Sequence, residues 1–145
     1  MSDLDLVADL AKKSGLVWIR FDGHDQAVWH EWVDGAVCVV GEGGEQPLPP
    51  VHDDDIVTLL LRSKTNRQLV ASVDATTETV APGSPAWDDV TAALKSGRLN
   101  LPDMDTAIER WARESRVLRF APFEPVTLAD GLSSWRRLSR PRLSG

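Results

Sequence analysis

The sequence predicts a mainly β fold of the α+β class, in which about six antiparallel strands form a closed or half-closed barrel with peripheral helices. Residues 16–40 contain three short runs of β-forming residues separated by Asp-Gly pairs. Two further β-rich runs follow at 56–62 and 68–80, and helical patterns come only before and after these strands. Closely spaced strands with helices added late favour an antiparallel barrel over a parallel βαβ fold.

The first strands lie between two tight turns. Residues 16–21 alternate between two faces, and this period of two is typical of a strand. Asp34-Gly35 separates two β-rich runs and predicts a tight hairpin, because both of its residues tolerate positive φ. Asp22-Gly23 is expected to start a longer loop. The second strand should then cover 27–33 and the third 36–40.

Three helices are predicted. Residues 2–14 have Ser2 as an N-cap, acids in the first turn and lysines in the last, so they form a short amphipathic helix. Ser84-Pro85 is expected to open the second helix, with serine as its N-cap and proline at its first position. Asp103 is expected to cap the third, in which Trp111 lies on the apolar stripe and therefore in the core.

Two segments are predicted to be interrupted by proline. Residues 41–55 hold three glycines and three prolines, so they should form an irregular and partly stiff loop. The last strand is expected over 115–120, because Pro122 and Pro125 follow it and should end the regular pattern.

We expect one domain over residues 1–132 and a basic tail over 133–145. A chain of 145 residues is long enough for one sizeable core. The tail holds four arginines and no acid, although the whole chain has a net charge of −6. The remainder is therefore strongly acidic and would repel a phosphate backbone, so no nucleic-acid partner is expected.

The chain is expected to be cytoplasmic, with no membrane partner. No apolar run approaches the length that spans a bilayer, and residues 1–15 lack the apolar segment of a secretory signal. Cys38 is the only cysteine, so no internal disulfide can form, and its place within a strand predicts a buried small side chain.

The residues themselves predict neither a metal site nor a catalytic group. His24-Asp25 and residues 52–55 combine metal-ligating side chains, but adjacent residues rarely converge on one ion without a distant ligand. The glycines of 41–44 lack the lysine and the strand-to-helix context of a phosphate-binding P-loop. No serine or cysteine lies in the setting of an activated nucleophile.

Four stretches together carry a family resemblance. They are LVWIRFDGHDQAVWHEWVDGAVCVVGEGGEQ, VTLLLRS, RQLVASVDATTETVAPGSP and SRVLRFAPFEPVTL, which lie between Leu16 and Leu128. Their order and turns resemble the pyridoxamine 5'-phosphate oxidase-like FMN-binding split β-barrel family. The resemblance implies a split β-barrel that pairs as a homodimer, with FMN or a deazaflavin coenzyme at the subunit interface. The cofactor would supply the chemistry, which is hydride transfer.

The resemblance also implies a set of cofactor-binding residues: His30, Trp32, Val39, Val40, Gly41, Gly44, Gln46 and Gln68. One position departs from the family pattern. Where the family has hydroxyl and cationic residues that grip the phosphate, this sequence has Gly43-Gly44-Glu45-Gln46. Glu45 would repel a phosphate there, and backbone N–H groups of the glycines would offset this only in part.

Two functions therefore stay open. The first is a flavin- or deazaflavin-binding oxidoreductase-like homodimer, in which His30 and neighbouring tryptophans line a pocket for a planar ligand. The second is a non-catalytic split-barrel dimer that has lost phosphate binding and serves as a binding or structural protein, with no cofactor. A cationic turn at 62–64 could receive a phosphate in place of the lost cluster, or could be a solvated hairpin turn.

Overall fold

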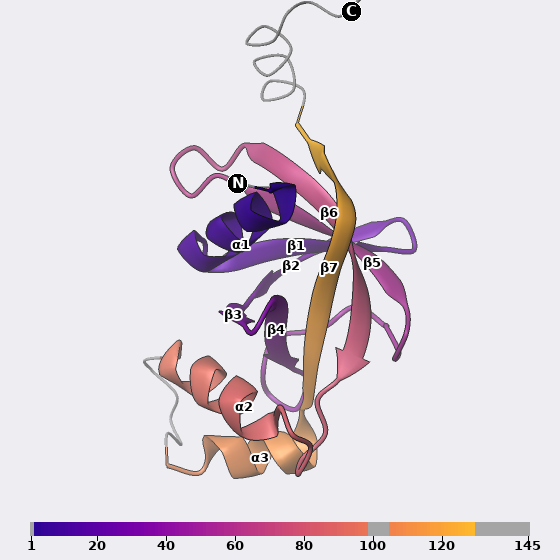
Figure 1. Ribbon diagram of the computed structural model, residues 1–145. Helices are drawn as coiled ribbons and strands as arrows, with labels where there is room; N and C mark the ends of the chain where they lie inside the picture. The colour runs from indigo at the N-terminus through magenta and orange to yellow at the C-terminus, as the bar shows by residue number, and fades with distance from the viewer. Residues whose placement is uncertain (1, 99–104, 130–145) are drawn as a thin grey trace, which may run out of the picture.

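Figure 1 shows the computed structural model of the chain, which describes residues 2–98 and 105–129. Its strands form one antiparallel sheet of seven strands in the order β2-β1-β5-β6-β7-β4-β3. The elements in chain order are α1 (Asp3–Lys13), β1 (Leu16–Phe21), β2 (His24–Trp29), β3 (Glu31–Val33), β4 (Ala36–Gly41), β5 (Ile56–Arg62), β6 (Leu69–Thr79), α2 (Trp87–Ser96), α3 (Ala107–Glu114) and β7 (Arg116–Leu128).

The two edge strands of this sheet, β2 and β3, are separated in the chain by His30 alone. A sheet whose first and last strands are joined by one residue must curl round into a barrel, and β2 and β3 together fill the place of one strand. The predicted mainly β barrel of about six strands is therefore confirmed. The prediction of a single strand over 27–33 is wrong, because β2 ends at Trp29 and β3 begins at Glu31. The backbone bends at His30, whose N–H donates to the carbonyl of Gly15 at 3.2 Å.

The two Asp-Gly pairs within residues 16–40 form two-residue hairpin turns. Asp34 and Gly35 have φ values of 50° and 80°, which confirms the predicted tight turn between β3 and β4. Asp22 and Gly23 have φ values of 53° and 79° and join β1 directly to β2. The longer loop predicted after Asp22 is wrong, because the second strand already begins at His24.

Strand β4 is buried along its whole length because the barrel has two apolar layers. Val37 and Val39 face the barrel interior, where they join a core that α1 covers through Val7 and Ala11. The alternate residues of β4, Ala36, Cys38 and Val40, face outward into a second core, which is covered by α2 and α3 through Trp87, Val90, Leu94 and Trp111. Figure 1 shows these two helices together at one end of the barrel. The loop that leaves β4 therefore emerges beside both helices.

Strand β7 continues through both prolines, so the predicted end of the strand at residue 120 is wrong. Residues 118–120 pair with β4 on one side and β6 on the other, 116 and 117 pair with β4 alone, and 121–123 and 126–128 pair with β6 alone. Pro122 thus lies in an edge segment, and Pro125 lies in a bulge where the register with β6 shifts. Edges and bulges are the places where a strand tolerates a residue without an N–H.

The predicted start of α1 is confirmed, and that of α2 is wrong. Ser2 caps α1 as expected, in a capping box with Asp5. Helix α2 instead follows Ala86, and the Ser84 hydroxyl makes no cap bond, because residues 84–86 form a turn. Helix α3 follows Thr106, and Asp103 lies outside the described residues. The tail at 133–145 also lies outside them. In 2–98 and 105–129, no helix is long and apolar enough to cross a membrane.

Candidate functional site

The loop after β4 is tightly folded over residues 42–46. Glu42, Gly43 and Gly44 have φ values of 66°, 56° and 92°, and the N–H of Glu42 donates to the carbonyl of Gln46 at 2.7 Å. A Cβ atom on Gly43 would collide with the carbonyl of Glu114 at the end of α3. Glycine is therefore required at 43 both for its backbone conformation and for this close approach.

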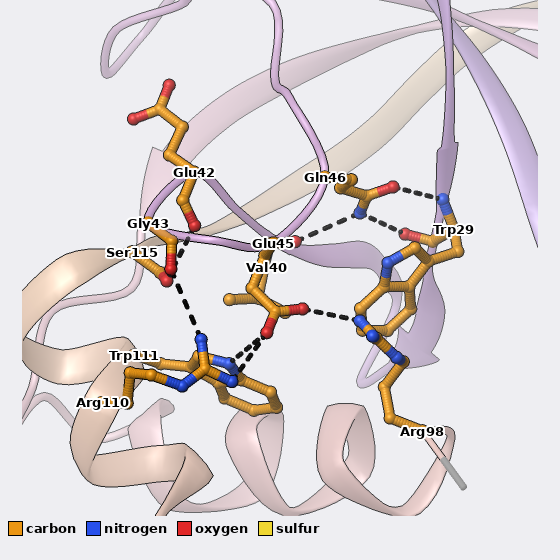
Figure 2. A network of polar contacts seen from close by, with 10 residues as sticks. All are labelled: Trp29, Val40, Glu42, Gly43, Glu45, Gln46, Arg98, Arg110, Trp111 and Ser115. Atoms are coloured by element: carbon orange, nitrogen blue, oxygen red, sulfur yellow. Dashed lines mark hydrogen bonds and ion pairs between the residues drawn. The ribbon is translucent and has the colours of Figure 1, made fainter. Parts of the chain in front are cut away.

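The Glu45 side chain points from this loop into a cluster of donors (Figure 2). Its Oε1 accepts from Nη1 of Arg98 at 2.6 Å, and its Oε2 accepts from Nη2 of Arg110 at 2.9 Å and from the indole N–H of Trp111 at 3.2 Å. The carboxylate side chain is 2% exposed, and the two arginine side chains are 33% and 20% exposed. One carboxylate thus holds the end of α2, helix α3 and the loop together.

The folded chain favours the ionised form of the Glu45 carboxyl group. Burial raises the pKa of this carboxyl, but the hydrogen bonds from Arg110, Trp111 and Arg98 outweigh burial and hold the pKa below its ordinary value. Arg98 is further positioned over the ring of Trp29, with its guanidinium carbon 4.6 Å from the ring centroid. Both cations beside this loop are therefore already bound by the protein's own anion.

Gln46 binds backbone atoms of two strands. Its Oε1 accepts from the N–H of Trp29 at 2.8 Å, while its Nε2 donates to the carbonyls of Trp29 at 3.0 Å and Val40 at 3.1 Å (Figure 2). The amide group thus continues the hydrogen bonding of β2 at the point where the strand bends. Since its oxygen and both N–H groups are already used, Gln46 holds the loop onto the barrel.

Two adjoining hollows lie beside this loop. One has a volume of about 560 Å³ and is lined by Gly15, Trp29, His30, Glu31, Gly44, Glu45, Gln46, Gly97 and Arg98. The other, of about 190 Å³, is lined by Ala11, Lys12, Lys13, Ser14, Gly15, His30, Glu31 and Trp32. They share Gly15, His30 and Glu31. Burial raises the pKa of Glu31.

The structure brings four of the eight predicted cofactor-binding residues to these hollows. His30, Gly44 and Gln46 line the larger one, and His30 and Trp32 line the smaller. The His30 ring is nevertheless buried, and its Nε2 donates to the carbonyl of Ala11 at 2.9 Å. Burial lowers the pKa of His30 and outweighs that hydrogen bond, which favours the neutral ring.

The other four predicted residues lie elsewhere. Val39 and Val40 are fully buried, one in each core, and Gly41 is packed against Leu48 and the backbone of Gln46. Gln68 is exposed in the β5–β6 hairpin and does not line either hollow. The cofactor roles given to all eight residues stay predictions.

The partners of Glu45 were missed by sequence reasoning. No role was predicted for Arg110, and Trp111, which is buried as predicted, was given no polar role. Cys38 is buried as predicted, and burial raises the pKa of its thiol to about 12. Across 2–98 and 105–129, no three metal-ligating side chains gather in one place.

Comparison with solved structures supports the fold. A conserved hypothetical protein from Mycobacterium tuberculosis matches with a TM-score of 0.62 and 20% identity, covering 100% of this chain and 92% of that one. A candidate pyridoxamine 5'-phosphate oxidase from Listeria innocua matches at 0.58 and 8%, covering 89% and 99%. An FAD-binding protein from Mycobacterium smegmatis matches at 0.57 and 16%, covering 86% and 93%.

These structures include proteins of the class that the sequence resembles, so the resemblance is confirmed at the level of the fold. The chain has the split β-barrel fold, mainly β with peripheral helices. No protein-family model and no curated protein sequence matches it.

The loop at 42–46 does not fit the phosphate of FMN. A phosphate there would need the cations of Arg98 and Arg110, and both already bind the buried carboxylate of Glu45. The negative charge of the Glu45 carboxylate would strongly repel a phosphate anion placed in the same desolvated site. No catalytic step is therefore derived through a cofactor whose phosphate is bound at this loop.

Proposed function

We propose that the chain is a homodimeric split-barrel protein that binds the ring of a flavin or deazaflavin at the subunit interface, and acts as an oxidoreductase-like protein. The observation that carries the proposal is the position of His30, Trp32, Gly44 and Gln46 around two adjoining hollows. The M. smegmatis structure of the same fold is described as an FAD-binding protein. When bound, the cofactor would supply hydride transfer.

The protein's own groups would orient the ring. The residues that line the larger hollow include the aromatic Trp29 and the polar Glu31, beside Gly44. An aromatic face and a few polar groups are what a planar heterocycle requires for stacking and orientation. The Glu45 carboxylate would repel a phosphate from residues 42–46. The flavin ring would therefore bind in the larger hollow without a phosphate at that loop.

The second candidate is the non-catalytic dimer with no cofactor. The observation that favours it is Glu45, which replaces a phosphate-gripping residue of the family pattern and binds Arg98 and Arg110 within the folded chain. In that case the loop has become a structural contact between β4 and the two helices. The barrel would serve as a binding or structural protein.

Titration of the dialysed protein separates the two candidates. We expect riboflavin, FMN or the deazaflavin coenzyme to bind with quenching of its fluorescence, and sedimentation to show a dimer. A dimer that binds none of them would support the second candidate, and a monomer would contradict both. Trp29→Leu should weaken flavin binding, whereas Ile56→Ala, which changes an exposed apolar residue outside all of the hollows, is the control.

A further inference from the structure

A third hollow lies between the end of α1 and the β5–β6 hairpin. Its volume is about 490 Å³, and it is lined by Ser14, Gly15, Leu16, Trp18, Arg62, Ser63, Lys64 and Arg67. Three of these residues are cationic, and none of the described residues that line it is acidic. This hollow is separate from the Glu45 cluster and contains none of the eight predicted cofactor residues.

The cations of this hollow are not neutralised by a carboxylate that lines it. The pKa of Asp25 is lowered first by its hydrogen bond to Arg20, with only a smaller contribution from Arg62. Its two oxygens accept from Nε and Nη2 of Arg20 at 2.7 and 2.9 Å. The nearby acid is thus already occupied, and the hollow keeps a net positive charge.

Arg62 has an unused donor. Its Nε atom is buried and has no hydrogen-bond partner among the described residues, although a buried N–H normally has one. The guanidinium carbon lies 5.5 Å from the centroid of the Trp18 ring, and Nη1 donates to the carbonyl of Arg67 at 3.3 Å. The group is therefore held in position with donor capacity left over.

The hairpin presents Arg67 in an unusual backbone conformation. Its φ is 61°, a region that residues other than glycine, asparagine and aspartate rarely adopt. The turn is nevertheless ordered, because the Ser63 carbonyl accepts from the N–H of Arg67 at 2.8 Å and the Ser63 hydroxyl accepts from the N–H of Thr65 at 3.2 Å. An arginine kept where glycine would fit better points to a role for its side chain.

The remaining wall is apolar and open. Leu16 is 54% exposed, and the half-buried Trp18 ring lies two residues further along β1. We propose that this hollow binds an aromatic phosphate: the phosphate would contact Arg62, Lys64 and Arg67, and the aromatic body would contact Leu16 and the edge of Trp18. Arginine and lysine bind phosphate oxygens through charge-assisted hydrogen bonds, and an aromatic wall suits a flat ligand.

This site does not depend on the proposed flavin function, because its ligand class follows from the hollow alone. It does offer a place for the phosphate that residues 42–46 reject. A flavin that failed to bind at the Gly44 hollow would leave the aromatic-phosphate site standing.

The test is a nitrogen-15 NMR titration of the full chain with 1-naphthyl phosphate, and in parallel with 1-naphthol. We expect saturable shifts of the Trp18 indole and of the backbone at 62–67, with the phosphate binding at least about ten-fold more tightly than the alcohol. Equal binding of the two compounds would overturn the proposal, as would saturation without shifts at Trp18.

Three single-charge variants complete the test. Lys64→Ala and Arg67→Ala both change exposed residues, and each should weaken 1-naphthyl phosphate binding about five-fold. Arg113→Ala removes one exposed positive charge from α3, outside the hollow, and should leave the affinity unchanged. If the three variants bind alike, the attraction is only that of net charge and the site is refuted.

Discussion

Two regions of this barrel gather arginines, and they use them in opposite ways. Beside the loop at 42–46, Arg98 and Arg110 converge on a carboxylate that is 2% exposed. In the β5–β6 hairpin, Arg62 and Arg67 line an open hollow among whose described lining residues there is no acid. Arg98 and Arg110 are therefore bound within the folded chain, whereas Arg62 and Arg67 remain available to a ligand.

The difference shows that the role of a cationic cluster depends on whether the fold supplies its counterion. Glu45 is an internal anion in the loop where the family resemblance implies a phosphate, and in this chain it joins the loop after β4 to Arg98 and Arg110. Removing that anion should therefore damage the fold, whereas removing a hairpin cation should damage binding alone. Stability and binding measurements can separate the two regions.

The largest effect is expected for Glu45→Gln. The variant leaves two guanidinium groups beside a neutral amide in a desolvated pocket, and breaking a buried ion pair costs about 3 kcal/mol at the lower end of its usual range. We choose the lower end because Arg98 and Arg110 are partly exposed. For a chain of this size the melting temperature should fall by roughly 6 to 12 °C, as measured by calorimetry.

The matched control is Glu78→Gln. Glu78 also pairs with an arginine, at 3.5 Å from Arg119, but its side chain is 61% exposed. Exposed pairs contribute less than about 1 kcal/mol, so the melting temperature should barely change. An equal fall in melting temperature in the two variants would show that Glu45 contributes no more than an exposed acid.

The next effect concerns Gln46→Ala. It deletes hydrogen bonds to both backbone groups of Trp29 and to the carbonyl of Val40, which should cost about 2 kcal/mol by chemical denaturation. Gln26→Ala is the matched control, since its amide makes one bond, to the carbonyl of Pro47 at 2.6 Å. A Gln46 variant as stable as the Gln26 variant would instead favour a ligand-binding role for Gln46.

A smaller effect is expected from pH. The pKa of Glu45 in the folded chain lies below its unfolded value of about 4.3, so its stabilisation is complete above that value and is lost as pH falls through the folded one. The gap in unfolding free energy between the natural chain and Glu45→Gln should be constant from neutral pH to about 5 and then narrow. Other acids with lowered pKa values, such as Asp53, affect both chains and cancel. A gap that stays constant down to pH 3 would contradict this role.

Features encoded within a few residues were predictable. The turn at Asp34-Gly35 and the capping box at Ser2 depend on local backbone preferences, and the strand over 56–62 depends on a dense run of β-forming residues. The barrel followed from their order, because short antiparallel strands without crossover helices have few ways to bury one face each.

Features that depend on distant contacts were not predictable. The bend at His30 requires the carbonyls of Gly15 and Ala11, the latter 19 residues away in the chain. Arg98 and Arg110 reach Glu45 from 53 and 65 residues away. The sequence did reveal that Glu45 is wrong for a phosphate site. It could not reveal that the same carboxylate joins the loop to Arg98, Arg110 and Trp111.

The smallest change in stability is expected at Arg67, in the β5–β6 hairpin. Arg67→Gly removes a side chain from a backbone with φ of 61°, which costs an ordinary residue roughly 1 to 2 kcal/mol that glycine does not incur. Since glycine also loses more backbone entropy on folding, the net change should be a stabilisation of a few tenths to about 1 kcal/mol, measured by urea denaturation. Arg67→Ala keeps the strain and should be no more stable than the natural chain. If glycine at 67 stabilises the chain while 1-naphthyl phosphate binding weakens, the arginine is retained for binding at a cost in stability. If Arg67→Gly is destabilising, the side chain supports the fold and the two cationic regions differ less than their counterions indicate.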